Sequence, residues 1–168
     1  QLAVKNEDFK RLLANRAQKH LMDGGALTPS ANLARWAKLA KIIDKAIDAE
    51  SARWGDYRRD VHPYSSSPYE LYTRDNQYMT EQTFLTGTYF PQRTNVFIEQ
   101  LKTAGLFPSV AAPVLKVNNV AFNGGNVTRN SLLTITAAKG TIYYTTDGSD
   151  PVVWSGSTGT VSATAKSY

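Results

Sequence analysis

The densest group of polar side chains that could do chemistry lies between residues 50 and 56. Its members are Glu50, Arg53, Trp54 and Asp56. Glu50 and Arg53 are three residues apart, so they can form an ion pair on one helix face, while Trp54 covers apolar surface. Two interpretations stay open: the cluster supports a substrate or a catalytic loop in a larger domain, or it locks a helix end. Acidic side chains with the shifted pKa values of catalytic groups need a cleft around them, and the sequence of this cluster does not show one. No residue is therefore assigned a catalytic role.

Aromatic rings that could stack on a sugar form a second group. They are Tyr143 and Trp154 in the C-terminal part and, upstream, Tyr57, Tyr64, Tyr69, Tyr72 and Tyr78. Such rings serve equally well to pin an irregular segment to neighbouring helices, since they combine an apolar body with a polar edge. Both interpretations stay open, because pocket geometry cannot be derived from sequence.

The pattern of acidic and histidine residues predicts no metal site. Asp147 and Asp150 carry the oxygen ligands that calcium prefers, but they do not have the spacing of an EF-hand loop, and Asp-Gly and Asp-Pro are common in turns. His20 and His62 have no partner at zinc-ligand spacing. The chain contains no cysteine and no glycine-rich GxxxxGK loop. We therefore expect no cofactor in this chain.

Charge and hydropathy exclude two classes of partner. The 168 residues include 19 Lys and Arg against 14 Asp and Glu, a net charge of +5 that is spread along the chain rather than gathered in a basic stripe. Nucleic-acid binding is therefore not expected. No segment approaches the roughly 18 apolar residues of a membrane span, so none is predicted.

Helical periodicity runs through the first 107 residues. Asn6 can cap a helix over residues 7–22, and Thr28-Pro29 predicts the start of a second helix that ends at Gly55. The second helix carries an apolar stripe at spacings of three and four, which indicates a buried face. The side chains expected inside these two helices are Phe9, Leu12, Leu13, Leu21, Leu33, Trp36, Ala40, Ile43 and Ile47.

The rest of the helical part is less regular. Residues 57–78 are rich in Tyr, Pro and Ser, which predicts an irregular segment. A short helix is expected near Thr80, and a last helix is expected after Thr94 with its end at Gly105. The last helix should bury Val96, Phe97 and Leu101.

From Pro108 onward the composition changes to Val, Thr, Ser, Gly and Asn with little charge, and the periodicity becomes that of strands. Turns are predicted at Asn123-Gly124-Gly125 and at Asp147-Gly148. Strands are expected over residues 114–120, 132–137 and 142–146, with a weaker one over 161–165. The fold class expected is α+β: a helical segment over residues 1–107, then a small antiparallel β-sandwich over 108–168, incomplete beside the roughly 100 residues of an immunoglobulin-type sandwich.

Four segments carry a resemblance to known families. Residues 140–151, GTIYYTTDGSDP, resemble the C-terminal fibronectin-like module of chitobiases and β-hexosaminidases. Upstream, DGGALTP from Asp23, AESARWGD from Ala49 and YFPQRT from Tyr89 resemble the C-terminal end of the kinase-like domain in the CotH family of exported bacterial proteins. The CotH resemblance implies that the nucleotide-binding lysine and the metal-binding acids belong to segments preceding this chain, so none is transferred to it.

Together these observations predict a non-catalytic structural and interaction region of an exported, cell-surface CotH-like protein, of which this chain is a part. Two alternatives stay open. In one, Glu50 to Asp56 support the active site of a protein or glycan kinase; in the other, Tyr143 and Trp154 make the C-terminal part a carbohydrate-binding module. The expected partners are the remainder of the same polypeptide and a cell-surface glycan or protein.

Overall fold

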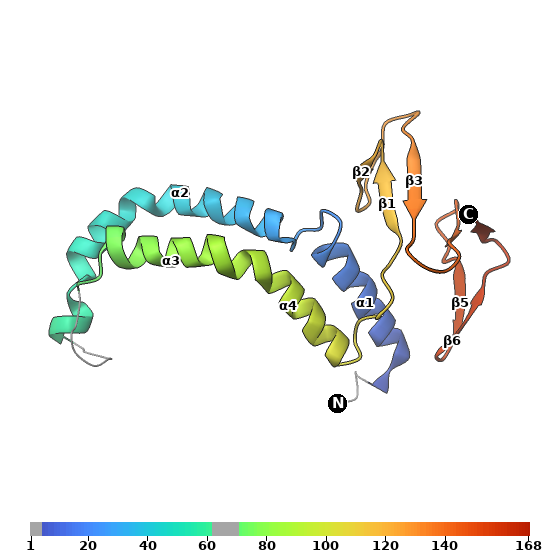
Figure 1. The fold of residues 1–168 in the computed structure, drawn as a ribbon, viewed down its shortest axis with the longest axis horizontal. Helices are drawn as coiled ribbons and strands as arrows, with labels where there is room; N and C mark the ends of the chain where they lie inside the picture. Colours follow the sequence, from blue (N-terminus) through green and yellow to red (C-terminus); the bar gives the residue numbers. More distant parts are fainter. Residues whose placement is uncertain (1–4, 62–70) are drawn as a thin grey trace. The chain divides into compact units, whose positions relative to one another are not determined.

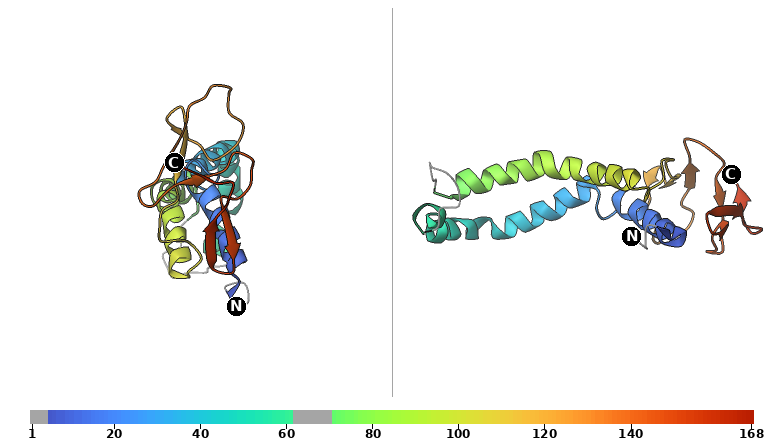
Figure 2. Two further views of the ribbon diagram at one scale, coloured as in Figure 1. Left: turned by 90° about the vertical axis from the view of Figure 1, so that its right-hand side faces the viewer. Right: turned by 90° about the horizontal axis from the view of Figure 1, so that it is seen from below.

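The computed structural model describes residues 5–61 and 71–168. The chain is α+β, as predicted: helices come first and short antiparallel strands follow (Figure 1). Two further views show the same order of elements (Figure 2).

The chain divides into two compact units. The mixed unit contains Gln1–Thr28 and Asn95–Tyr168, and the helical unit contains Pro29–Thr94. The division into residues 1–107 and 108–168 rests on composition and resemblance rather than on compactness, and it stays a prediction.

The first helix, α1 (Glu7–Leu21), starts where the sequence predicts. The side chain of Asn6 accepts a hydrogen bond of 2.9 Å from the backbone N–H of Phe9, which satisfies one unpaired donor of the first turn. Glu7 and Asp8 lie in that turn, where the partial positive charge of the helix end favours carboxylates. The predicted cap is confirmed.

The core of the mixed unit lies between α1 and α4 (Phe90–Thr103). Its members are Ala17, Leu21, Ile98 and Leu101, with Met22, Leu106 and Phe107 packed against them. The prediction was wrong for Phe9 and Leu12, which are 41% and 57% exposed. The reason is that α1 contributes to this core only through its C-terminal half.

On α4 the buried face differs from the expected one. Thr94, Ile98 and Leu101 are buried and recur at spacings of four and three, so they form a single stripe. Val96 and Phe97 were expected inside, but Val96 lies on the opposite side of the helix, Phe97 lies at the edge of the stripe, and both are exposed. Of the three predicted core residues, only Leu101 is buried.

The C-terminal end of α4 is confirmed at the predicted glycine. Gly105 has a φ of 67°, a left-handed conformation that glycine adopts without steric cost. Its N–H donates to the carbonyl of Lys102, and the N–H of Leu106 donates to the carbonyl of Leu101, each at 2.9 Å. This pair of bonds satisfies carbonyls that the last helical turn leaves unpaired.

The helical unit consists of two antiparallel helical runs. The first, α2 (Pro29–Trp54), begins and ends where Thr28-Pro29 and Gly55 predict. The second lies side by side with α2 in both figures (Figures 1 and 2). It is built from η3 (Arg74–Tyr78), α3 (Met79–Phe84), η4 (Leu85–Tyr89) and the first residues of α4.

Contacts between the two runs are polar as well as apolar. The indole N–H of Trp36 donates to Gln82 at 2.7 Å, and its ring meets Phe90 with centroids 5.7 Å apart. The predicted apolar stripe of α2 faces this seam only in part: α2 has no fully buried residue, and Ile43 is exposed.

Part of the segment expected to be irregular is helical with wide turns. η2 (Tyr57–Val61) and η3 are π-helical, so the prediction was wrong for both. Residues 62–70 lie outside the described part of the chain. The short helix expected near Thr80 is α3, and that prediction is confirmed.

The last helix starts earlier than expected, before Pro91 rather than after Thr94. The sequence pattern placed its start after Thr94. Instead α4 begins at Phe90 and follows η4 without a break, with Pro91 in its first turn. The N–H of Phe90 donates to the carbonyl of Leu85, five residues back, and this wider turn precedes the missing N–H of the proline.

Seven short strands form three antiparallel sheets within the described residues. The first sheet has the order β2-β1-β3, the second pairs β4 with β7, and the third pairs β5 with β6. The strands are β1 (Val114–Val117), β2 (Val120–Ala121), β3 (Leu133–Thr136), β4 (Tyr143–Tyr144), β5 (Val152–Ser155), β6 (Thr158–Val161) and β7 (Lys166–Ser167).

Two tight hairpins depart from the predicted strands. The strand expected over residues 114–120 is broken at Asn118-Asn119, where both residues have positive φ and Val117 pairs with Val120. The hairpin of β5 and β6 was not predicted, and the weak strand expected over 161–165 ends at Val161. The turn of the β5–β6 hairpin is Gly156-Ser157, and a two-residue Gly-Ser loop between strands is a recognised hairpin signal in a sequence.

Candidate functional site

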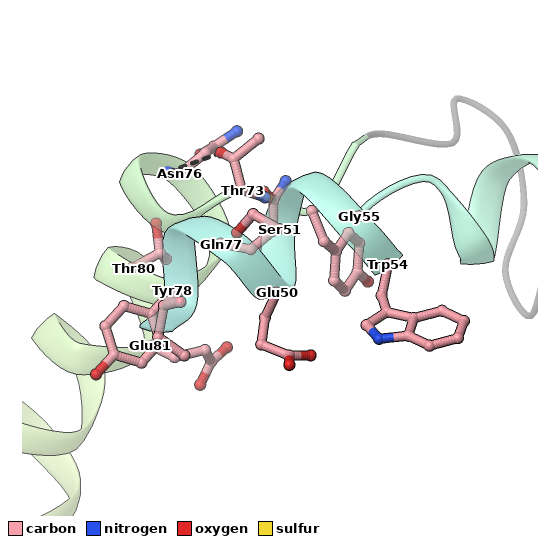
Figure 3. A pocket seen from close by; sticks show the side chains of 12 residues that line it. Glu50, Ser51, Trp54, Gly55, Thr73, Asn76, Gln77, Tyr78, Thr80 and Glu81 are labelled. Carbon is pink, nitrogen blue, oxygen red and sulfur yellow. Dashed lines mark hydrogen bonds between the residues drawn. The ribbon is translucent and has the colours of Figure 1, made fainter. Parts of the chain in front are cut away.

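A groove of about 620 Å³ lies in the helical unit, between the last turns of α2 and the start of the second helical run (Figure 3). From α2 it is lined at helical spacing by Ile47, Glu50, Ser51 and Trp54, followed by Gly55. Its other wall is formed by Tyr72, Thr73, Asn76, Gln77, Tyr78, Thr80 and Glu81. The volume is in the range of small-molecule sites.

Gly55 holds the two walls together. Its N–H donates to the carbonyl of Ser51 and its carbonyl accepts from the N–H of Tyr72, each at 2.9 Å. Gly55 is buried, and a Cβ there would come within 3.0 Å of the carbonyl oxygens of Ser51 and Tyr72. Glycine is required because any larger residue would push the segment at Tyr72 away from the end of α2.

Two carboxylates face the groove from opposite walls. Glu50 comes from α2 and Glu81 from α3, and Figure 3 shows both side chains projecting on the same side of the ribbon. In the part of the chain that the structure describes, neither carboxylate forms an ion pair. The described side chains therefore give this groove a negative charge.

Further along the contact between α2 and the second helical run, the charge of Asp44 is neutralised by Arg74. Arg74 donates to Asp44 on α2 and to its neighbour Asp75, each at 2.7 Å. The hydrogen bond to Asp44, followed by the one to Asp75, raises the pKa of Arg74. The same pair of helices therefore has an arginine for Asp44 but none for Glu50 or Glu81 among the described side chains.

The predicted cluster of Glu50, Arg53, Trp54 and Asp56 is divided by the structure. Glu50 and Trp54 line the groove together, whereas Asp56 lines a neighbouring hollow. Among the described residues Arg53 forms no ion pair with Glu50; its guanidinium lies 5.1 Å from the ring centroid of Trp54. An adjacent aromatic face thus takes the place of the expected partner.

Several rings of the tyrosine group gather here. Tyr72 and Tyr78 line the groove, and Tyr57 meets Trp54 edge-on with centroids 6.5 Å apart. The hydroxyl of Tyr78 is buried and has no hydrogen-bond partner in the described part of the structure. Tyr64 and Tyr69 lie outside the described residues.

Glu81 was not singled out from the sequence. Glu81 is 31 positions from Glu50, as their numbers show, and it lies in a short helix without a distinctive motif. No local signal marks it. Only the antiparallel pairing of the two helical runs brings it to the groove.

Trp154 is held from two directions within the mixed unit. It lies on β5 opposite Gly159 of β6, and its ring is within 3.0 Å of the position a Cβ on that glycine would take. The guanidinium of Arg11 on α1 lies 4.5 Å from the ring centroid and donates to the carbonyl of Gly156 at 2.7 Å. A sugar stacking on this ring would have to share it with Arg11.

Tyr143 lies elsewhere in the mixed unit, on β4, opposite Ser167 of β7. It is exposed, but it belongs to a different sheet from Trp154. The two predicted glycan contacts therefore do not share one sheet surface, and a role for them in glycan binding stays a prediction.

The carboxylates of Asp147 and Asp150 accept hydrogen bonds within turns. Asp147 accepts from the backbone N–H of Ser149 at 2.9 Å and from its hydroxyl at 2.6 Å. These bonds, the hydroxyl first, lower the pKa of Asp147. Asp150 accepts from the N–H of Val152 at 2.8 Å. Both side chains stabilise local backbone turns.

Within residues 5–61 and 71–168, no group of three or more His, Asp or Glu side chains is arranged to hold a metal ion. His20 lies on α1, and His62 is outside the described residues. None of the helices in the described ranges combines the length and apolar character that crossing a bilayer requires.

No protein-family model matches this chain, and neither a curated protein nor a solved structure matches it. The resemblances to the CotH family and to the chitobiase-type module therefore stay predictions from the sequence.

Proposed function

We propose that this chain is a non-catalytic structural and interaction region whose helical unit packs against the remainder of its own polypeptide. One observation carries the proposal. Among the described residues of Pro29–Thr94, no hydrophobic side chain is buried, although the two helical runs are rich in large apolar residues. Two amphipathic helices of this length bury more apolar surface when a further element covers them.

The uncovered surface is largest on α2. Ile42 is 69% exposed, and Leu39, one turn earlier, is also exposed. The opposite run exposes Met79, Phe84 and Tyr89. Exposed apolar residues that recur on one element are typical of interaction surfaces rather than of freely solvated helices.

The sequence resemblance supports placing the parent polypeptide outside the cell or on its surface, as part of a CotH-like protein. In that setting the C-terminal strands act as a spacer or as a contact to a surface glycan or protein. Support of a kinase active site by Glu50 and its neighbours is the enzymatic alternative, and Glu50 is available to it because the carboxylate faces an open groove.

The packing proposal is tested by charging the exposed face. Ile42→Asp should leave the isolated 168-residue chain within about 0.5 kcal/mol of wild type, because the side chain is solvated there. In the complete parent polypeptide it should cost about 2 kcal/mol, since a buried isoleucine would be replaced by a charge. Denaturant unfolding of both forms measures the difference.

Lys38→Asp, at an exposed position one turn away on the same helix, is the matched control and should have little effect in either form. If Ile42→Asp behaves like Lys38→Asp in the complete polypeptide, this face of α2 stays solvated and the proposal fails.

A further inference from the structure

We propose that Asn123-Gly124 is a site of spontaneous covalent modification, in which water converts the side-chain amide of Asn123 to a carboxylate through a cyclic imide. The modification removes a hydrogen bond that joins this loop to the end of α1. The first observation is the pair of residue types: Asn123 is the only asparagine of the 168-residue sequence that precedes a glycine. Because glycine has no Cβ, its backbone nitrogen can approach the preceding side chain, whereas a branched residue shields that nitrogen.

The backbone around Gly124 leaves the nitrogen accessible. Gly124 has a φ of 93°, which favours glycine, and a Cβ there would meet nothing within 4 Å. Among the described residues its N–H donates no hydrogen bond. It belongs to the loop of residues 122–132, which forms no helix or strand between β2 and β3. The loop can therefore take the conformation in which the nitrogen of Gly124 meets the side chain of Asn123.

The reaction needs only water besides the chain itself. A base removes the N–H proton of Gly124, and the nitrogen attacks Cγ of Asn123. A bond forms between these two atoms, the bond from Cγ to Nδ2 breaks, and Nδ2 takes up a proton and leaves as ammonia. Water then opens the imide at one of its two carbonyl carbons, which gives aspartate or isoaspartate. Both products carry a carboxylate in place of the neutral amide.

The amide of Asn123 has a structural role before it reacts. The carbonyls in the last turn of a helix have no partner inside the helix, and in α1 those of Gln18 and His20 accept backbone N–H groups close in sequence. The carbonyl of Lys19 accepts instead from the side-chain amide of Asn123, 104 positions further along the chain. A carboxylate has no donor, so the product cannot form this bond. It also brings a negative charge to the negative end of the helix dipole.

This loss acts on the half of α1 that contributes to the core of the mixed unit. Ala17 and Leu21 are the buried residues of α1, and Lys19 lies between them in sequence. The modification should therefore loosen the last turn of α1. The first turn, which Asn6 caps, should be unaffected.

The reaction is tested by incubating the 168-residue chain in mildly alkaline buffer and mapping its peptides by mass spectrometry. Fragment ions should show that Asn123 gains the mass difference between an amide and a carboxylic acid several times faster than Asn119 and Asn126, which both precede valine. Asn123→Gln should abolish the rapid gain, because the longer side chain would have to close a six-membered ring.

The structural consequence is tested by hydrogen exchange in Asn123→Asp. The amides in the last turn of α1 should exchange about fivefold faster than in wild type, the size expected for one lost hydrogen bond. Those of the first turn should keep their rates. Asn126→Asp is the matched control, because it adds the same charge at an exposed position of the same loop, and it should leave α1 unchanged.

The proposal is overturned if Asn123 reacts no faster than Asn126 in the folded chain, if Asn123→Asp leaves the exchange of α1 at the wild-type rate, or if Asn126→Asp accelerates it equally. Should Asn123→Asp fail to fold, the modified wild-type protein, separated from the unreacted form by ion exchange, replaces it. Wild-type exchange in the last turn of α1 of that protein would contradict the capping role of Asn123.

Discussion

At the scale of single residues, several polar side chains of the described structure have defined partners. Asp147 closes its turn through Ser149, Asn6 caps α1, and Arg11 joins the ring of Trp154 to the hairpin carbonyl of Gly156. Glu50 and Glu81 differ from these because they lie on opposite walls of a groove, where their carboxylates face solvent. That contrast separates residues that stabilise the fold from those available to a ligand.

The Asp147 turn gives a pH-dependent prediction. The Ser149 hydrogen bonds place the folded-state pKa of Asp147 below its ordinary value of 3.8. The turn's contribution to stability is therefore complete above about pH 4 and is lost as the pH falls through the folded-state pKa. Ser149→Ala should return the pKa toward its ordinary value, measured by NMR titration of the Asp147 carboxyl carbon.

Ser157→Ala, in the turn between β5 and β6, serves as the control and should leave the titration of Asp147 unchanged. A Ser149→Ala protein whose Asp147 titrates at the wild-type pH would show that another group, not Ser149, lowers the pKa.

At the scale of elements, the second helical run depends on wide turns. η3 and η4 flank α3 and continue into α4, so a proline and a segment rich in turn residues are absorbed without ending the helix. Glycines have opposite roles in the two runs. Gly55 is confined by two carbonyl oxygens, whereas a Cβ at Gly87 in η4 would meet nothing within 4 Å.

This difference predicts opposite effects of the same substitution. Gly55→Ala should destabilise the helical unit by about 2 kcal/mol or more, because backbone atoms must move to admit the methyl group. Gly87→Ala should stabilise it by about 0.5–1 kcal/mol, since alanine loses less backbone entropy in a helix. Thermal unfolding followed by circular dichroism measures both. Equal effects of the two substitutions would contradict the close packing at Gly55.

At the scale of the whole molecule, the two units differ in their cores. The mixed unit buries Ala17, Leu21, Ile98 and Leu101, while the described residues of the helical unit bury no hydrophobic side chain. Few buried contacts mean a low free energy of local opening. Each unit is therefore expected to open on its own.

Hydrogen exchange provides the corresponding measurement. In the isolated chain, the amides of α2 should exchange faster than those of residues 95–103 in α4, because α2 has no buried residue to hold it. In the complete parent polypeptide the amides of α2 should become protected. Slow exchange of α2 in the isolated chain would show that the helical unit is stable without a neighbour.

Local signals were read correctly from the sequence where a few adjacent residues decide the backbone. The cap at Asn6, the start at Pro29 and the end at Gly105 depend on single backbone conformations, and each was predicted. The helix across Pro91 was missed, because the wide turn before it depends on bonds that no propensity encodes. Burial was predicted least well, since Phe9 and Val96 have the right character but lie on uncovered faces.

By itself, the sequence determined that this protein is α+β, with helices before strands, and where α1 and α2 begin and end. The tertiary structure alone decided that Glu50 meets Trp54, Tyr78 and Glu81 in one groove while Arg53 turns to an indole. The physical reason is that helix caps and turns are set within a few residues of chain. A groove is set by the alignment of two helices, which here depends on the long-range contacts of Trp36 with Gln82 and of Asp44 with Arg74.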